Sequence, residues 1–350
     1  PLTRMVGIEH PVVQTGMGWV AGARLVAATA NAGGLGILAA ATMTIDELAT
    51  AITKVKAATD RPFGVNIRAD AADAGDRIEL MIREGVKVAS FALAPNQELI
   101  ARLKESGAVV IPSIGAAKHA RKVAAWGVDA VIVQGGEGGG HTGPVPTTLL
   151  LPSVLDALEG TNVAVITAGG FFDGRGLAAA LSYGAAGVAM GTRFLLTSDS
   201  TVPEAVKQRY LAAGLDGTVV STRVDGMPHR VLKTGLVEKL ESGSRMRGFS
   251  AAILNAAKFK KMSKMTWTSM IRDGLAMRHG KELTWSQVVM AANTPMLLKA
   301  GLVDGSTRAG VLASGQVTGI IEDLPSCAEL IDGIVNDAIK HLQAASSLID

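Results

Sequence analysis

Short apolar runs alternate with longer Ala-rich stretches along the first 200 residues, and this alternation limits the folds available. The runs occupy residues 12–14, 35–40, 63–67, 86–93, 108–113, 129–134, 163–168 and 187–191. Their apolar residues follow one another directly, as in parallel strands that are buried on both faces. Several intervening stretches end in glycine, which favours a helix end, and Thr44 with Glu47 predicts a capping box. Eight strand–helix units over this length predict an α/β chain with a (β/α)8 TIM barrel.

A doubly wound sheet is the alternative for such a pattern. That fold usually carries G-x-G-x-x-G after its first strand and an acidic residue about 20 positions later. Gly16, Gly18 and Gly22 follow the first run here, but their spacing is GxGxxxG, and the acidic residue is missing from the expected stretch. The sequence therefore favours the barrel.

The pattern changes after the eighth run. Residues 200–285 are interpreted as helical or irregular, and within them 245–281 hold nine Lys and Arg against the single acid Asp273. A glycine-rich turn at 313–319 and a helix near 326–345 follow. We expect a barrel over 1–200, a helical basic substrate-binding segment over 201–285, and a C-terminal segment over 286–350 that returns to the barrel.

Composition narrows the class of protein. Apolar residues make up 48% of the chain, enough for a sizeable core, and a single cysteine excludes a disulfide framework or a cysteine-zinc site. The one cysteine also suggests a reducing compartment, so we expect a cytoplasmic protein. A net charge of +3 and 4% aromatic residues argue against nucleic-acid binding. Because no run approaches 20 apolar residues, and the N-terminus has no apolar stretch, neither a membrane span nor a leader is expected.

The strand ends carry the candidate chemistry, because barrel active sites lie at the carboxyl ends of the strands. Glycines follow the seventh and eighth strands, in Ala168-Gly169-Gly170 and Gly191-Thr192. Exposed backbone N–H groups at these positions favour a bound phosphate. The alternative is that the glycines only form tight turns, but both loops carry the signal where barrels bind phosphate.

Two amides end predicted strands. Asn66 and Gln134 can each donate and accept hydrogen bonds, which suits a heterocycle with mixed edges such as a flavin or a base. Taken singly, each amide is equally consistent with a structural role. Together with the phosphate loops, they indicate a mononucleotide across the barrel mouth.

His141 is the candidate catalytic histidine. It lies within the glycine-rich residues 135–143, where it fills no helix face, and histidine is the usual proton-transfer group near neutral pH. Glu137 and His141 do not make a metal site by themselves, so no metal is expected. The remaining histidines, at 10, 119, 229, 279 and 341, are interpreted as surface or core residues.

Several reaction classes are disfavoured by what the strand ends lack. The only cysteine, Cys327, lies far in sequence from every strand end, which argues against a cysteine nucleophile. No predicted strand ends in lysine, so Schiff-base chemistry is not expected. No pair of carboxylates stands at strand ends, which argues against a glycosidase.

The strand-end motifs give the chain a resemblance to a known family. PVVQTGMGWVAG, GVNI, VQGGEGGGHTG, ITAGGFFDGRGLAAALSYGAAGVAMGTRF and ASGQVTGII span essentially the whole chain. Together they resemble the nitronate monooxygenase family and the related FMN-dependent enoyl reductases. The resemblance implies that His141 is catalytic. It also implies FMN contacts from the residues Gln14, Thr15, Gly16, Met17, Asn66, Gln134, Gly139, Gly140, Ala168, Gly169, Gly170, Gly191 and Thr192.

Within the family, the sequence is similar to actinobacterial dehydrogenases of ring-containing CoA thioesters that act in steroid C/D-ring catabolism, part of cholesterol degradation. This implies an FMN enzyme that dehydrogenates or hydrogenates the α,β position of an acyl-CoA, with NAD(P) as a candidate electron partner. The alternative is a nitronate monooxygenase that oxidises alkyl nitronates with O2. A third hypothesis is a non-catalytic flavin- or RNA-binding protein, against which His141 and the low aromatic content argue.

The basic residues 245–281 separate the first hypothesis from the second, because a small nitronate needs no cationic patch. We expect the phosphates of CoA to be bound there, with candidate contacts from Arg245, Arg247, Lys258, Lys260 and Lys261. A solvated helical face is the alternative for such a charge run. The exact substrate, the electron acceptor, the direction of the reaction and a homo-oligomeric state stay open.

Overall fold

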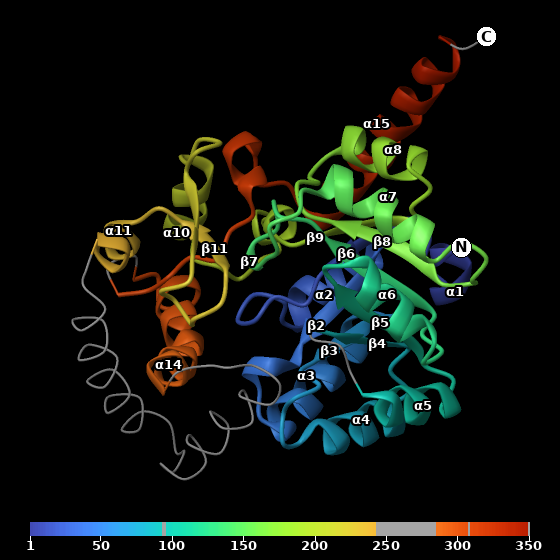
Figure 1. The fold of residues 1–350 in the computed structure, drawn as a ribbon, viewed down its shortest axis with the longest axis horizontal. Coiled ribbons are helices and arrows are strands. Elements are labelled where there is room, and N and C mark those ends of the chain that lie inside the picture. The colour runs from blue at the N-terminus through green and yellow to red at the C-terminus, as the bar shows by residue number, and fades with distance from the viewer. Residues whose placement is uncertain (93–95, 243–284, 307–308, 349–350) are drawn as a thin grey trace.

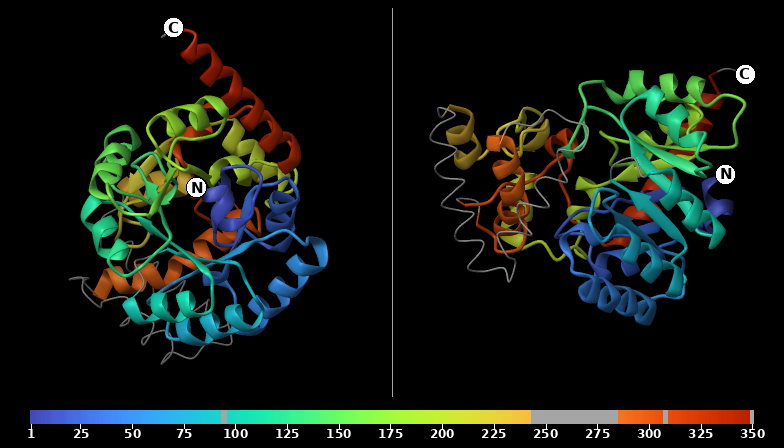
Figure 2. Two further views of the ribbon diagram at one scale, coloured as in Figure 1. Left: turned by 90° about the vertical axis from the view of Figure 1, so that its right-hand side faces the viewer. Right: turned by 60° about the horizontal axis from the view of Figure 1, so that its bottom comes forward.

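A computed structural model of the chain describes residues 1–92, 96–242, 285–306 and 309–348. Eight parallel strands form a closed barrel in sequence order, with the last strand pairing with the first (Figures 1 and 2). Seven strands lie within their predicted runs and β5 extends one residue beyond its run, so the barrel prediction is confirmed. The strands are β1 (Val12–Gln14), β2 (Leu35–Ala39), β3 (Gly64–Ile67), β4 (Val88–Phe91), β5 (Val109–Ile114), β6 (Ala130–Gln134), β8 (Ala164–Ala168) and β9 (Gly187–Met190).

Helices follow the strands and surround the barrel in the end-on view of Figure 2. The capping box that begins α3 is confirmed, because Thr44 Oγ1 accepts from Glu47 N and Glu47 Oε2 accepts from Thr44 N. The helices after the strands are α2 (Ala23–Asn31), α3 (Ile45–Ala58), α4 (Ala74–Arg83), α5 (Gln97–Glu105), α6 (Ala117–Ala124), α7 (Thr147–Ala157), α8 (Gly174–Ser182) and α9 (Thr192–Leu195), with a 3-10 turn η1 (Ala40–Thr42) after β2.

Two apolar layers explain why the strands show no alternation. Val13, Ile132 and Ile166 belong to one buried cluster inside the barrel, which the N-terminal helix α1 (Leu2–Val6) closes at one end. Neighbouring positions such as Val131 belong to a second cluster between the strands and the helices. Apolar side chains are therefore needed on both faces of each strand.

Beyond the barrel, the chain adds a lobe over the mouth (Figure 1). A three-stranded antiparallel sheet joins β10 (Thr218–Ser221) and β11 (His229–Leu232) to β7 (Gly140–His141). The interpretation of residues 200–285 as helical or irregular was therefore wrong for 218–221 and 229–232. These strands are only four residues long and mix polar with apolar residues, so they lack the continuous apolar run of a barrel strand. The other elements are α10 (Glu204–Leu211), α11 (Gly235–Ser242), α14 (Trp285–Leu302), η2 (Gln316–Ile320) and α15 (Cys327–Ser346).

The C-terminal helix α15 packs against α8 and α2. The contact is close, because a Cβ on Gly174 would lie 2.4 Å from Ala338 N. The buried Arg193 of α9 also holds the preceding segment through an ion pair to Asp323, at 2.6 Å between Nη1 and Oδ1. The predicted helix near 326–345 is thus confirmed. Among the helices described, none is long and apolar enough to span a membrane.

Candidate active site

His141 lies in strand β7, at the edge of the glycine-rich residues 135–143. Gly140 has a φ of +71°, a conformation that favours glycine, and His141 pairs with His229 of β11. The Gln134 side chain also holds the strand, because its Nε2 donates to the His141 carbonyl at 2.7 Å. The structure therefore presents His141 from a paired strand at the barrel mouth, where the sequence suggested an open loop.

A buried carboxylate contacts the ring of His141. Asp225 Oδ2 lies 2.5 Å from His141 Nε2, and the Asp225 side chain is 5% exposed whereas that of His141 is 52% exposed. An ionised carboxylate only accepts hydrogen bonds, so His141 Nε2 carries the proton of this bond. In the neutral ring, the lone pair is then on Nδ1. Among the described residues, none bonds to Nδ1, so this atom is available to a substrate.

Asp225 is held in its ionised form. Burial raises the pKa of this carboxyl, but the hydrogen bonds and charges of His141 and His229 outweigh burial and place the pKa well below its usual range. Met227 N donates to the other carboxylate oxygen at 3.1 Å. A negative charge therefore lies beside His141 at neutral pH.

His229 is a site residue that the sequence interpretation missed. It is buried, its Nδ1 lies 3.2 Å from Asp225 Oδ2, and its ring centroid is 4.8 Å from that of His141. Asp225 and His229 lie four residues apart, but nothing in that spacing places them beside His141. The three residues also present possible metal-ligand atoms within 4.8 Å of one another. Their mutual hydrogen bonds already account for this arrangement.

Glu137 does not join His141. Its carboxylate accepts from the backbone N and the side-chain oxygen of Thr147, at 3.0 and 2.7 Å, and so caps the beginning of α7. The Cys327 thiol is likewise remote from the chemistry. It is buried beside Thr29, and burial raises the pKa of Cys327 to about 12.

The ends of β8 and β9 form the candidate phosphate site. Gly169 and Gly170 have φ values of +99° and +83°, and Gly191 precedes the first residue of α9, Thr192. Within the described part of the chain, no acceptor bonds to the backbone N–H of any of these four residues. A Cβ on Gly170 would come no closer than 3.7 Å to another residue, so there is space before this loop. Four unpaired donors beside open space fit the phosphate of FMN.

Other predicted FMN contacts converge on the same mouth. A Cβ on Gly16 would lie 2.5 Å from Asn66 Cβ, and one on Gly191 would lie 3.2 Å from Thr15 Oγ1 and 3.4 Å from Met17 Sδ. The ends of β1, β3 and β9 are therefore close neighbours. Ala168 belongs to the buried lining inside the barrel. The contacts of all the residues in this paragraph with FMN stay predictions.

The predicted amides and the Thr192 hydroxyl already have protein partners. Asn66 Nδ2 donates to Ser90 Oγ at 3.2 Å, and Thr192 Oγ1 accepts from Gly315 N at 2.8 Å. Gln14 is fully buried, with Nε2 donating to the carbonyls of Thr15 and Ile37, whereas its Oε1 has no partner among the described residues. The bond of Asn66 is consistent with the structural role that the sequence left as an alternative for this amide, and its contact with FMN stays a prediction.

The glycine-rich turn at 313–319 reaches the mouth. The sequence placed it in a segment expected to return to the barrel, but assigned it no contact with the site. A Cβ on Gly139 would lie 2.5 Å from Gly315 N, and Gln316 N donates to the Glu137 carbonyl at 2.9 Å. The turn therefore packs on the loop that presents His141. The glycines of ASGQVTG were the available signal, because only residues without side chains permit this approach.

The predicted substrate contacts Arg245, Arg247, Lys258, Lys260 and Lys261 lie outside the described residues. The proposed CoA contacts of that segment stay a prediction.

The chain is similar to known proteins over nearly its whole length. The family model of nitronate monooxygenase matches residues 1–337. A Mycobacterium tuberculosis protein is 84% identical over 350 residues, covering 100% of this chain and 99% of that protein. It is named (3aS,4S,5R,7aS)-5-hydroxy-7a-methyl-1-oxo-octahydro-1H-indene-4-carboxyl-CoA dehydrogenase, and a Rhodococcus jostii protein of the same name is 71% identical, covering 99% and 98%. The structure of FabK from Thermotoga maritima superposes with a TM-score of 0.82 at 31% identity, covering 99% and 98%.

Proposed function

The chain belongs to the nitronate monooxygenase family, and on that premise we propose that it is an FMN-dependent dehydrogenase of a ring-containing acyl-CoA. The name of the 84% identical relative supports this substrate class, because it places the CoA thioester on carbon 4 of a fused ring system. The α carbon and both β carbons of such a thioester are ring carbons. We propose dehydrogenation across this α,β position, as part of steroid C/D-ring catabolism.

The arrangement of His141 and Asp225 carries the proposal. Because Asp225 accepts a hydrogen bond from Nε2–H of His141, the basic atom of this ring is Nδ1. Nδ1 takes the α proton of the thioester, and the Asp225 carboxylate stabilises the imidazolium that results. Burial keeps Asp225 and His229 away from water, so the orientation of the ring is set before substrate arrives.

The cofactor would be held by the backbone N–H groups at 169, 170, 191 and 192, with the phosphate as their acceptor. When bound, FMN supplies the acceptor for the hydride that leaves the β carbon. The two hydrogens removed from substrate are then accounted for, one as a proton on His141 and one as a hydride. NAD(P) is our proposed partner for reoxidation, and we propose a cytoplasmic location.

Anaerobic stopped-flow spectroscopy tests the function. We expect bicyclic CoA thioesters to bleach the flavin absorbance of the enzyme and to yield the α,β-unsaturated thioester, with alkyl nitronates far slower. Adding NAD(P)+ or O2 to the reduced enzyme then identifies the electron acceptor. Rapid bleaching by nitronates, with none by any CoA thioester, would instead establish a nitronate monooxygenase.

Replacing Asp225 by Asn should lower kcat by up to about 10⁴-fold, the loss typical when the aspartate that orients a catalytic histidine becomes asparagine. The variant loses the charge beside the imidazolium, so the acid limb of the kcat profile should move to lower pH. Steady-state rates between pH 5 and pH 9 measure both effects. A uniform loss of rate with an unmoved acid limb would show that Asp225 only supports the fold.

A further inference from the structure

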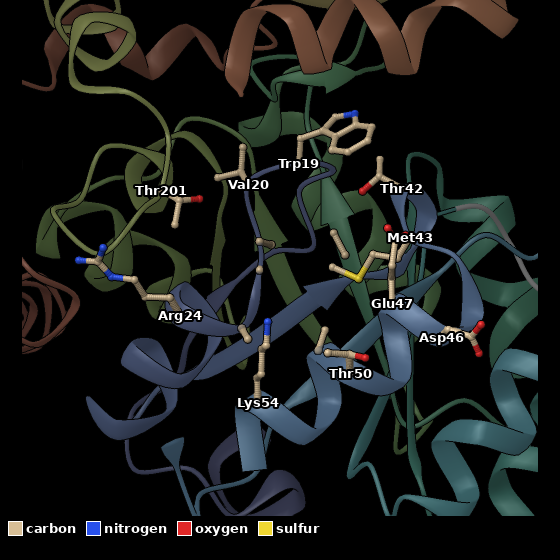
Figure 3. A pocket seen from close by; sticks show the side chains of 15 residues that line it. Trp19, Val20, Arg24, Thr42, Met43, Asp46, Glu47, Thr50, Lys54 and Thr201 are labelled. Atoms are coloured by element: carbon tan, nitrogen blue, oxygen red, sulfur yellow. The ribbon is translucent and has the colours of Figure 1, made fainter. Parts of the chain in front are cut away.

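A groove with a volume of about 670 Å³ lies between α2 and α3, next to the barrel mouth (Figure 3). Apolar residues line its interior, among them Val20, Ala21, Met43 and Ala51. Charged side chains stand around it. The groove is separate from the His141 cluster and from the predicted phosphate loops, so the proposed reaction leaves it without a role.

The charges around the groove are segregated. Asp46 and Glu47 belong to the first turn of α3, and the Glu47 carboxylate is committed to Thr44 N at 2.7 Å. Lys54 follows Glu47 by seven residues on the same helix, about 10 Å further along its axis. Figure 3 shows Lys54 and Arg24 on the side of the groove away from Asp46. One end is thus cationic although the lining as a whole is balanced.

Arg24 and Lys54 have hydrogen-bond donors that bond no acceptor among the described residues. Arg24 Nη2 donates to the Ser198 carbonyl at 3.1 Å and lies 3.9 Å from Asp199 Oδ1, a long and exposed ion pair. Its Nε and Nη1 have no acceptor among the residues described. Lys54 Nζ likewise has no ion-pair partner in the described chain. An anion at this end would gain hydrogen bonds without breaking a strong ion pair.

Trp19 connects the groove to the barrel mouth. It follows Met17 in the segment after β1, and its φ of +67° is costly for an aromatic residue. Its Nε1 donates to the Pro295 carbonyl of α14 at 2.9 Å, and Lys299 Nζ lies 5.6 Å from its ring centroid. The adjacent Thr294 donates to the carbonyl of Val224, next to Asp225. The same turn of α14 therefore contacts both the end of the groove and the segment that carries Asp225.

We propose that this groove binds the adenosine 3′,5′-diphosphate end of the CoA thioester, with Arg24 and Lys54 as phosphate contacts. The pantetheine arm passes Trp19 into the mouth, where the acyl ring meets His141. This inference rests on the proposed function and deepens it. The groove suits an extended ligand of this kind, because its apolar lining would contact the adenine and the pantetheine arm whereas its cations would contact the phosphates.

The double variant Arg24→Ala/Lys54→Ala tests the groove in the FMN-loaded enzyme. We expect KM for the CoA thioester to rise about 10- to 100-fold, as for the loss of two charge-assisted contacts, with kcat within about twofold. Lys118→Ala/Arg121→Ala is the matched control, because it removes one Lys and one Arg from the exposed face of α6. This control should leave KM unchanged.

Two further measurements distinguish a loss of phosphate binding in the groove from a change in the chemical step. The pantetheine thioester of the same acid lacks the nucleotide phosphates, so the groove variant and the unsubstituted enzyme should process it equally. Calorimetry with adenosine 3′,5′-bisphosphate should show binding that the groove variant loses.

An unchanged KM in the groove variant, together with normal binding of the bisphosphate, would overturn the groove assignment. A raised KM in Lys260→Glu/Lys261→Glu alone would place the phosphates on the basic segment instead. If no thioester is turned over by the unsubstituted enzyme, the proposed function fails, whereas the bisphosphate titration still decides the groove.

Discussion

Replacing His141 by alanine should leave FMN bound and lower turnover by about 10²–10⁴-fold, the usual range for a lost general acid–base group. The imidazole is half exposed at the mouth, and Asp225 fixes Nε2, so Nδ1 is the atom that can take a proton from substrate. Among the described residues, neither neighbouring candidate can replace it as the base, because His229 is buried and Glu137 is bonded to Thr147. The flavin absorbance spectrum and kcat, measured on the same preparation, check the prediction.

His341→Ala is the matched control for that variant. His341 also contacts an aspartate, with 3.5 Å between Nε2 and Asp337 Oδ1, but it lies exposed on α15 away from the barrel mouth. We expect its rate to be unchanged. Near-normal turnover of His141→Ala between pH 5 and pH 9 would instead show that His141 only supports the strand pairing, and another group would have to take the proton.

The barrel could be predicted from the sequence because its physical demands are local. A strand buried on both faces needs a continuous apolar run, and each of the eight runs coincides with one strand to within a residue or two at its ends. β10 and β11 are not buried along their whole length, so they need no continuous apolar run. They face the barrel mouth on a small antiparallel sheet, and residues such as Arg230 and His229 have polar partners there, so no apolar periodicity marked them.

The site residues divide in the same way, into those that a local pattern predicts and those that only the folded chain brings together. The glycines at 169, 170 and 191 could be predicted as a phosphate site because phosphate loops lie at fixed places after barrel strands, and that role stays a prediction. Asp225 and His229 could not be found in this way, because their role depends on β11 pairing with β7, and Asp225 lies 84 residues from His141 in sequence. Gly315 was missed for the same reason. Its contact with Thr192 spans 123 residues, and only the return of the chain to the mouth creates it.

Replacing Gly170 by Glu should abolish FMN binding, the largest effect that we expect from a single substitution. Gly170 has a φ of +83° and an N–H without an acceptor in the described residues, at the proposed phosphate position. The added carboxylate would enter the space in front of that N–H and repel a phosphate dianion. Glu137 Cβ lies 3.7 Å from the Cβ position, so the new side chain would also contact Glu137.

Gly160→Glu separates this effect from backbone strain. Gly160 has a similar φ of +76°, and a Cβ there meets no atom within 4 Å. This residue lies in the turn between α7 and β8, at the opposite end of β8 from Gly170. Both variants pay about 1–2 kcal/mol for a side chain in the left-handed region. Only Gly170→Glu should be colourless after purification, with circular dichroism unchanged in both. Mass spectrometry of the cofactor released from the unsubstituted enzyme should identify FMN. Release of FAD, or a Gly170→Glu variant that still binds FMN fully, would contradict the phosphate site. Neither outcome is compatible with a single terminal phosphate held at these four N–H groups.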